Sequence, residues 1–275
     1  MERVRKFLKK LFYIVEKPYM RVLPGQLAFF TVLSLIPLVA ALGMIASCFS
    51  IPISSFSSVI SKILPADITG LATTGISGKG LTFNLIVFFL TSFFLASNGA
   101  HSIIITSNEI YGIEGRGFFG RRLKAIIITI IIVLLIMFIL TVPVFGNNIF
   151  DAIKDEIGDG KTLEFLSYLF KIIRIPITML LMFFVVKIIY HMAPDKKIGI
   201  KDSNLGPIFT TVMWIIGTEI YSIYVRNFTN YNLFYGSISN ILILMIWVYF
   251  LSYIFVFGMA INATEDENQE NMNRE

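Results

Sequence analysis

Apolar residues gather into six long runs along the chain, and shorter segments containing Gly, Pro, Asn or charged residues separate them. A helix of about 20 apolar residues is long enough to cross the ~30 Å hydrocarbon layer of a membrane. Helices suit this environment because they satisfy their own backbone hydrogen bonds where lipid offers no partner. The pattern therefore predicts six transmembrane helices, at residues 26–50, 81–107, 125–145, 163–190, 205–226 and 238–262.

The composition also indicates a membrane protein. The 275 residues are 56% hydrophobic and only 15% charged, and the mean hydropathy is +0.77. In soluble domains, about a quarter of the residues are charged. We therefore expect an all-α, polytopic membrane protein with a single membrane domain over residues 1–263.

Lysine and arginine are unevenly distributed between the two sets of alternate connecting segments. Fifteen of the 23 fall on the side that holds both chain ends, and five fall on the other side. Cytoplasmic segments carry the excess of Lys and Arg in membrane proteins. Both termini are therefore expected in the cytoplasm. The remaining three basic residues lie in the fourth run, where their long side chains can reach the two interfaces.

The segments outside the apolar runs differ in character. Residues 1–25 are predicted to form a retained, amphipathic cytoplasmic segment. Residues 51–80 either lie on the outer interface or dip into the membrane. Residues 264–275 are polar and predicted to be disordered. Cys48 has no second cysteine in the chain, which excludes an intrachain disulfide.

One carboxylate, Glu219, lies inside the fifth apolar run, seven residues before Arg226. At 1.5 Å per residue, this is about 10 Å below the outer end of the helix. A charge at such a depth is costly unless water, a proton or a cation accompanies it. Arg174, near the outer end of the fourth run, is a candidate partner. The alternatives are a protonated or water-facing Glu219, with Arg174 reaching the interface alone.

The second apolar run contains the polar stretch "SNGAHSIIITSNEIY". Residues 97, 101, 104, 105 and 108 fall on one helical stripe, which predicts a polar seam that faces other helices. Most such seams are interhelical hydrogen bonds worth about 0.6 kcal/mol each. A substrate or proton pathway through His101 is the alternative.

The stretch "GTEIYSIYVRNFTNYNLFYGS" at 217–237 crowds tyrosines and asparagines at the outer end of the fifth run. Aromatic belts are common at membrane interfaces. A tight polar turn between the fifth and sixth helices and a ligand site are both open alternatives. The residues expected along a substrate or ion pathway are Asn98, His101, Asn108, Arg174, Glu219, Tyr224, Arg226, Asn227, Tyr231, Tyr235 and Asn262.

Three stretches resemble the YihY/BrkB family of bacterial inner-membrane proteins: "QLAFFTVLSLIP" at 26–37, "SNEIYGIEGRGFFGRRLKA" at 107–125 and "NFTNYNLFYGSISNILILMIWVYFLSYIFVFGMAINA" at 227–263. The resemblance covers about residues 20–263 and implies a polytopic helical protein of the inner, cytoplasmic membrane. The family ending usually reads Gly, a small residue, Glu, an apolar residue and Asn, but here Ala260 replaces the Glu. A role for a carboxylate at that point is therefore lost or displaced.

An enzyme is the class of function that the residues support least, although a ribonuclease label has been attached to the family. Hydrolytic metal sites need clustered His, Asp or Glu, whereas the chain has only two histidines, His101 and His191. No HExxH, GxSxG or P-loop stretch is present. Asp195, close to His191, is interpreted as ordinary loop polarity. We expect no catalytic activity, no cofactor and no metal site.

Two other functions fit the polar residues. A transporter or lipid translocator in envelope homeostasis would use them as a pathway. A non-catalytic scaffold for an envelope-assembly complex would use them for helix packing. Membrane lipids are the expected partners, and a homo-oligomer or an envelope protein partner is left open. No nucleic-acid binding is expected, because the excess Lys and Arg residues lie in the segments where membrane topology alone would place them.

Overall fold

The computed structural model describes residues 12–48, 83–115, 117–134, 161–196, 204–227 and 239–272, and all regular secondary structure in these residues is α-helix. The long helices are α2 (Tyr19–Cys48), α5 (Phe83–Ile110), α7 (Lys161–Met192), α8 (Leu205–Asn227) and α10 (Ser239–Met272). A short helix at residues 12–16 precedes α2, and a further helix covers residues 118–134. The prediction of an all-α protein is confirmed, and each predicted apolar run overlaps one of these helices.

The helices extend beyond the apolar runs at several ends. The helix at residues 118–134 begins seven residues before the predicted run, and α10 continues to Met272, through residues predicted to be a disordered tail. Residues 264–272 contain neither Gly nor Pro and are rich in Glu and Gln, which favour helix. The polarity of this segment was therefore a poor guide to its secondary structure. Residues 51–80 lie outside the described residues.

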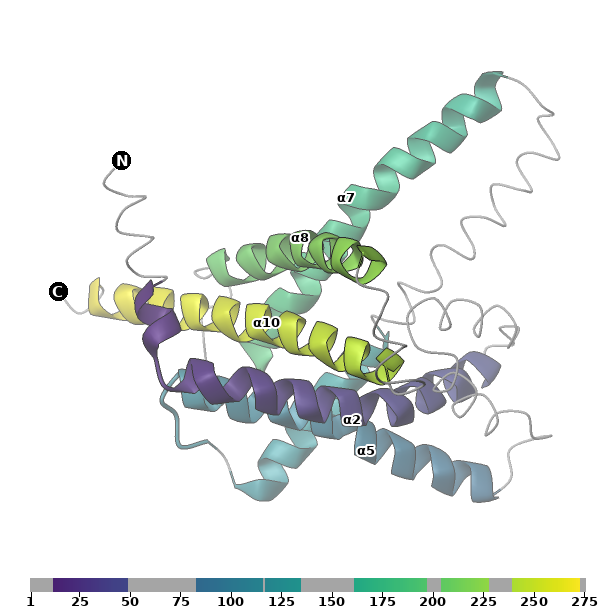
Figure 1. Cartoon of the computed structure of the whole chain (residues 1–275). Coiled ribbons are helices and arrows are strands. Elements are labelled where there is room, and N and C mark those ends of the chain that lie inside the picture. The colour runs from purple at the N-terminus through teal and green to yellow at the C-terminus, as the bar shows by residue number, and fades with distance from the viewer. Residues whose placement is uncertain are drawn as a thin grey trace, which may run out of the picture.

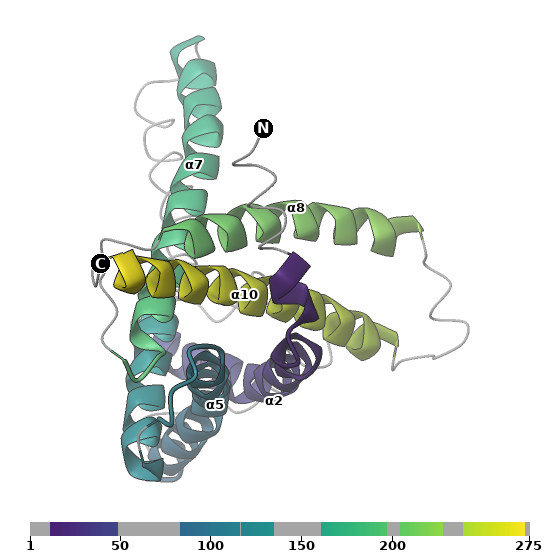
Figure 2. The same ribbon diagram turned by 90° about the vertical axis from the view of Figure 1, so that its left-hand side faces the viewer.

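Helix α10 lies in the middle of the helical assembly. It packs against α2 on one side and α8 on the other, and α2 packs against α5 (Figure 1). Helix α7 crosses these helices at a steep angle, and its first half projects away from them in both views (Figures 1 and 2). The buried apolar core joins the short helix at 12–16, α2, the second half of α7 and α10.

Small residues allow α8 and α10 to cross closely. A Cβ on Gly206 would lie 2.4 Å from the backbone oxygen of Gly258, and a Cβ on Gly258 would lie 1.9 Å from the Thr210 hydroxyl oxygen. Helix α5 approaches α2 in a similar way, because a Cβ on Gly99 would meet Ser34 Oγ at 3.2 Å. Such small-residue contacts are typical of helix packing in membranes.

Large apolar side chains cover much of the outer surface of the helices. Phe94 on α5 is 51% exposed and Ile220 on α8 is 58% exposed. Among the described residues, two helical stretches are long and apolar enough to cross a membrane by length and composition, Phe89–Ile110 and Ile241–Glu265, and Met179–Met192 is a shorter apolar stretch. Contiguous exposed apolar surface of this kind suits contact with lipid.

Candidate functional site

A polar cluster joins the end of α5 to the segment that follows α7. Asn108 Nδ2 donates a hydrogen bond to Asp195 Oδ2 at 2.8 Å, and the Asp195 backbone N–H donates to Asn108 Oδ1 at 2.9 Å. Asn108 is 5% exposed and the Asp195 side chain 2%. The amide of Asn108 therefore matches both a donor and an acceptor of a segment 87 residues away in the sequence.

Lys124, in the helix at residues 118–134, holds the same segment from the other side. Its ammonium donates to the backbone oxygens of Ala193 and Pro194 at 2.9 and 2.8 Å, and it forms an ion pair with Asp195 Oδ1 at 2.8 Å. All three ammonium protons thus have a partner. Charge-assisted hydrogen bonds of this kind are about twice as strong as neutral ones, so Lys124 fixes the end of α7 against the α5 side of the cluster.

The backbone of the turn that follows α5 packs against this cluster. Gly112 has a φ of 62°, which ends the helix in a left-handed conformation that favours glycine. The Ile113 N–H donates to the Asn108 backbone oxygen at 2.8 Å, which satisfies a carbonyl at the helix end. Gly115 has a φ of 70°, and a Cβ there would lie 2.8 Å from Asn108 Nδ2. Gly112 thus ends the helix, and Gly115 lets the backbone approach Asn108 and Asp195 closely.

Arg122 makes a second set of contacts with α5, nearer the middle of that helix. Its guanidinium donates to Asn98 Oδ1 at 2.8 Å and to the Phe94 backbone oxygen at 2.6 Å. The guanidinium also lies over the Phe94 ring, 3.6 Å from its centroid, which is a cation–π arrangement. These contacts attach the partly exposed Arg122 side chain to α5.

Two hydroxyl groups connect α10 to its neighbours at the same end. The buried Tyr190 hydroxyl on α7 donates to the Phe255 backbone oxygen at 2.5 Å and lies 2.7 Å from Thr210 Oγ1 on α8. Asn262 Nδ2 donates to the Tyr111 hydroxyl oxygen at 3.2 Å. Polar contacts thus join α5, α7, α8 and α10 where the small residues let them approach.

Much of the predicted polar stripe of α5 is buried against other parts of the protein. Ser97, Ile104 and Asn108 are buried, and the Ser97 hydroxyl donates to the Phe94 backbone oxygen at 2.6 Å. His101 is half-buried. Four buried side-chain atoms of α5 have no hydrogen-bond partner among the described residues: His101 Nε2, Ser102 Oγ, Thr106 Oγ1 and Ser107 Oγ.

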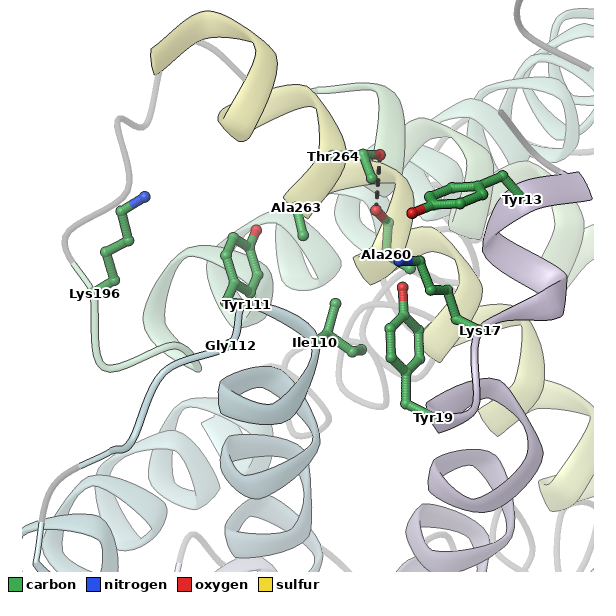
Figure 3. Close-up of a pocket in the computed structure, with 10 residues that line it drawn as sticks. All are labelled: Tyr13, Lys17, Tyr19, Ile110, Tyr111, Gly112, Lys196, Ala260, Ala263 and Thr264. Carbon is green, nitrogen blue, oxygen red and sulfur yellow. Dashed lines mark hydrogen bonds between the residues drawn. The ribbon is translucent and has the colours of Figure 1, made fainter. Parts of the chain in front are cut away.

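A cavity of about 410 Å³ lies beside the end of this stripe (Figure 3). It is partly open to the surroundings, and four segments form it: the short helix at 12–16 with the beginning of α2, the end of α5, the segment after α7 and the polar end of α10. Tyr111 lines it, so the cavity adjoins the contact between Tyr111 and Asn262. The lining residues are Tyr13, Lys17, Tyr19, Ile110, Tyr111, Gly112, Lys196, Ala260, Ala263 and Thr264.

The structure gathers only some of the residues predicted along a pathway. Asn108 lies in the polar cluster, and Asn262 contacts Tyr111 just after the end of α5. Asn98 accepts a hydrogen bond from Arg122 nearer the middle of α5, and His101 lies between Asn98 and Asn108 on the same helix. Glu219 and Tyr224 lie about four and five turns from the start of α8. Glu219 is exposed, and Tyr224 packs against Tyr221 with ring centroids 6.2 Å apart. The side chains of Arg174, Arg226 and Asn227, and all of Tyr231 and Tyr235, lie outside the described residues. The pairing of Glu219 with Arg174 stays a prediction.

The sequence does not reveal the roles of Asp195 and Lys124. Asp195 was interpreted as loop polarity, and that interpretation is wrong, because its carboxylate is buried between Lys124 and Asn108. A signal was present, since Asn108 and Lys124 both fall in the motif at 107–125. No local pattern, however, pairs that motif with residue 195. Ala260, where the family ending usually has Glu, lines the cavity.

The part of the chain that the structure describes contains no group of three or more His, Cys, Asp or Glu side chains that could hold a metal ion. The cluster contains a paired carboxylate, a paired ammonium, amides and hydroxyls. Lys124, Asp195 and Asn108 are paired with one another, so they hold the helix ends together. The arrangement supplies no nucleophile next to a general base in the sense that hydrolytic enzymes need.

Long apolar helices with an apolar outer surface and a buried polar cluster are the features of an all-helical membrane protein. The chain belongs to the virulence factor BrkB family, whose family model matches residues 17–275. This finding confirms the family that the three sequence stretches indicated.

Relatives in this family are named as membrane proteins or as ribonuclease-like. A Bacillus subtilis (strain 168) relative whose name describes it as ribonuclease-like, YfkH, is 32% identical over 263 residues, 94% of each chain. The UPF0761 membrane protein NTHI0384 of Haemophilus influenzae (strain 86-028NP) is 27% identical over 107 residues, 39% of this chain and 36% of that protein. No solved structure matches the chain.

Proposed function

We propose that the protein is a six-span transporter or lipid translocator of the bacterial inner membrane, with both chain ends in the cytoplasm. The observation that carries this proposal is the set of four buried polar atoms on α5 that lack a partner among the described residues. A buried polar group without a partner costs about 1–3 kcal/mol. Water or a passing solute is the partner that would remove this cost.

The positions of basic side chains support the proposed orientation in the membrane. Lys17, Lys124 and Lys196 lie near the same end of the helical assembly, and cytoplasmic ends carry the excess of basic residues. The beginning of the described chain and the end of α10 also lie on one side of the molecule (Figure 1). Both observations agree with chain ends on the cytoplasmic side.

The cavity lies at the end of α5, close to two of the buried hydroxyls that have no partner among the described residues. Thr106 and Ser107 lie one turn from Ile110 and Tyr111, which line the cavity. A solute that entered the cavity would therefore meet the polar part of α5 next. Glu219 does not carry the proposal, because it lies on an exposed face of α8.

Proteoliposomes test this function directly. The full chain would be reconstituted into vesicles of phosphatidylethanolamine and phosphatidylglycerol, and translocation of fluorescent phosphatidylglycerol and flux of K⁺ and phosphate would be measured. Thr106→Val removes a buried hydroxyl and keeps the side-chain shape. Thr91→Val is the matched control, because the Thr91 hydroxyl is exposed and donates to the Val87 backbone oxygen at 2.8 Å on the same helix.

We expect movement of at least one of these probes, a several-fold loss in Thr106→Val and little change in Thr91→Val. A protein that moves none of them, with Thr106→Val as stable as the wild type, would favour the scaffold. In that case the polar cluster would serve only to hold the helices together.

A further inference from the structure

Arg122 brings a positive charge to the middle of α5. Its guanidinium donates hydrogen bonds to Asn98 Oδ1 at 2.8 Å and to the Phe94 backbone oxygen at 2.6 Å. Asn98 lies well inside the apolar stretch Phe89–Ile110. At 1.5 Å per residue, it is about 14 Å from one end of this stretch and about 18 Å from the other. When the stretch spans a membrane, the charge therefore lies near the centre of the hydrocarbon layer.

The groups that bind Arg122 are neutral. Asn98 provides an amide oxygen, and Phe94 provides a backbone oxygen and the face of its ring. Lys124, two residues further along the same helix, is by contrast paired with the carboxylate of Asp195. An ionised side chain inside a membrane is costly, and such side chains are found paired or next to water. An anion beside Arg122 would lower this cost.

Polar atoms that lack a partner lie beside this charge. His101 and Ser102 follow Asn98 by three and four residues on α5, so they lie on the same side of the helix. His101 Nε2, Ser102 Oγ and Arg122 Nε are buried and have no hydrogen-bond partner among the described residues. The charge of Arg122 also acts on the imidazole of His101. These three side chains therefore offer polar atoms to a ligand at one level of the helix.

The charges along α5 favour an anion over a cation. The sequence of α5 from Phe83 to Asn108 contains no Asp or Glu. Pores that select anions are lined by Arg or Lys, whereas rings of Asp or Glu line cation channels. A cation that moved along α5 would meet the guanidinium of Arg122 without a carboxylate from this part of the helix.

We propose that Arg122, His101 and Ser102 form an anion-binding site at the middle of the α5 pathway, so that the pathway selects anions over cations. This inference rests on the proposed function and names the class of solute that the pathway takes.

The anion has two possible sources. One is a small inorganic anion such as phosphate, and the other is the phosphate group of an anionic phospholipid. Phe94 is 51% exposed, so a lipid headgroup could approach Arg122 from the outer surface of α5. Guanidinium and hydroxyl donors recognise phosphate oxygens in either case. The test must therefore separate the two sources.

The test measures how the charge of a thiol reagent affects its reaction at Ser102→Cys, in the full chain with Cys48→Ser in detergent. A negatively charged sulfonatoethyl thiosulfonate and a positively charged trimethylammonium thiosulfonate are compared, each relative to its rate with 2-mercaptoethanol. We expect the negative reagent to react about tenfold faster, because a nearby cation attracts it and repels the other. Equal relative rates, or faster reaction of the positive reagent, would overturn this inference and leave the hydrated pathway intact. No reaction with either reagent would refute the pathway and this inference with it.

Asn98→Asp tests whether Arg122 causes the selectivity. Aspartate has the shape of asparagine and keeps an acceptor for the guanidinium, but its charge neutralises Arg122. In the same cysteine background, we expect the preference for the negative reagent to disappear while the Tm stays equal or rises. An unchanged preference would show that Arg122 has only a structural role. Thr91→Val, which removes an exposed hydroxyl from the same helix, is the control and should keep the preference.

Protection of the cysteine at position 102 from a neutral thiosulfonate separates the two sources, and it decides the matter if Asn98→Asp fails to fold. The ligands are inorganic phosphate, dihexanoyl phosphatidylglycerol and zwitterionic dihexanoyl phosphatidylcholine. Several-fold slower labelling with inorganic phosphate would identify a small anion, and protection by phosphatidylglycerol alone would identify a lipid headgroup. Equal protection by the two lipids, or protection by none of the three ligands, would contradict the proposed site.

Discussion

Asn108 and Asp195 are joined by two hydrogen bonds, of 2.8 and 2.9 Å, that connect the end of α5 to the segment after α7. The same carboxylate pairs with Lys124, so three separate segments meet at one buried side chain. This contact ties the end of α5 and the helix at residues 118–134 to the segment that follows α7. The cluster therefore determines the shape of the end of the molecule where the cavity lies.

Removal of the Lys124 ammonium is expected to destabilise the protein strongly. Lys124→Met leaves the Asp195 carboxylate buried without its cation and removes the donor to Ala193 and Pro194. Breaking a buried ion pair by removing one partner costs about 3–5 kcal/mol. Thermal unfolding in detergent should show a clear decrease in Tm.

The double variant Lys124→Met/Asp195→Asn supplies the control for this prediction. The neutral amide at position 195 no longer needs a cation, so the double variant should be more stable than Lys124→Met alone. If the effects of the two substitutions simply add, the ion pair contributes nothing of its own and the structural account of the cluster is wrong.

Gly258→Ala should disrupt the crossing of α8 and α10. The added Cβ would lie 1.9 Å from the Thr210 hydroxyl oxygen and 2.8 Å from the Tyr190 hydroxyl oxygen. Overpacking of this kind costs about 1–3 kcal/mol, which a lower Tm would report. Gly25→Ala is the control, because its Cβ would make only an ordinary contact of 3.9 Å with Tyr249. Equal stability of the two variants would contradict the close crossing.

Arg122→Lys should destabilise the contact between α5 and the helix at residues 118–134. A lysine cannot make both hydrogen bonds of the guanidinium or stack in the same way on Phe94. Loss of a hydrogen bond to a charged group costs about 1.5–3 kcal/mol. Arg121→Lys is the control, since it is the same substitution at the preceding residue, whose Nε has no hydrogen-bond partner within the described part of the chain. A Tm decrease no larger than that of the control would refute this role.

The helices of this protein could be predicted from the sequence because long apolar runs have few alternatives in lipid. The polar stripe of α5 could also be predicted, since the period of an α-helix places residues 97, 104 and 108 on one face. Helix ends were less accurate, as the extension of α10 to Met272 shows. A run of polar residues at the membrane interface can extend a helix as well as end it, so polarity alone does not locate the end of the helix.

The partners of the polar residues could not be predicted from local pattern. Asp195 follows a helix in a polar segment, where a solvated loop residue and a buried ion-pair partner have the same local sequence signature. The pairing with Asn108 and Lys124 spans 87 and 71 residues. Ala260 lines a cavity that four separate segments of the chain form, so its position there could likewise not be predicted from local sequence.

The central claim, that α5 borders a hydrated pathway, is tested most directly by cysteine accessibility. The native cysteine is removed by Cys48→Ser, and single cysteines are introduced by Ser102→Cys, at one of the buried hydroxyls of α5 that have no partner among the described residues, and by Leu33→Cys on α2. Ser34 contacts Gly99 across these helices, so Leu33, which is 54% exposed, lies at a similar depth on the apolar outer surface.

The measurement is the rate of reaction of each cysteine with a membrane-impermeant charged thiosulfonate in membrane vesicles. The account predicts that the cysteine at position 102 reacts at least tenfold faster than the cysteine at position 33. Equal, slow labelling at both positions would contradict the hydrated pathway and the transport function that depends on it.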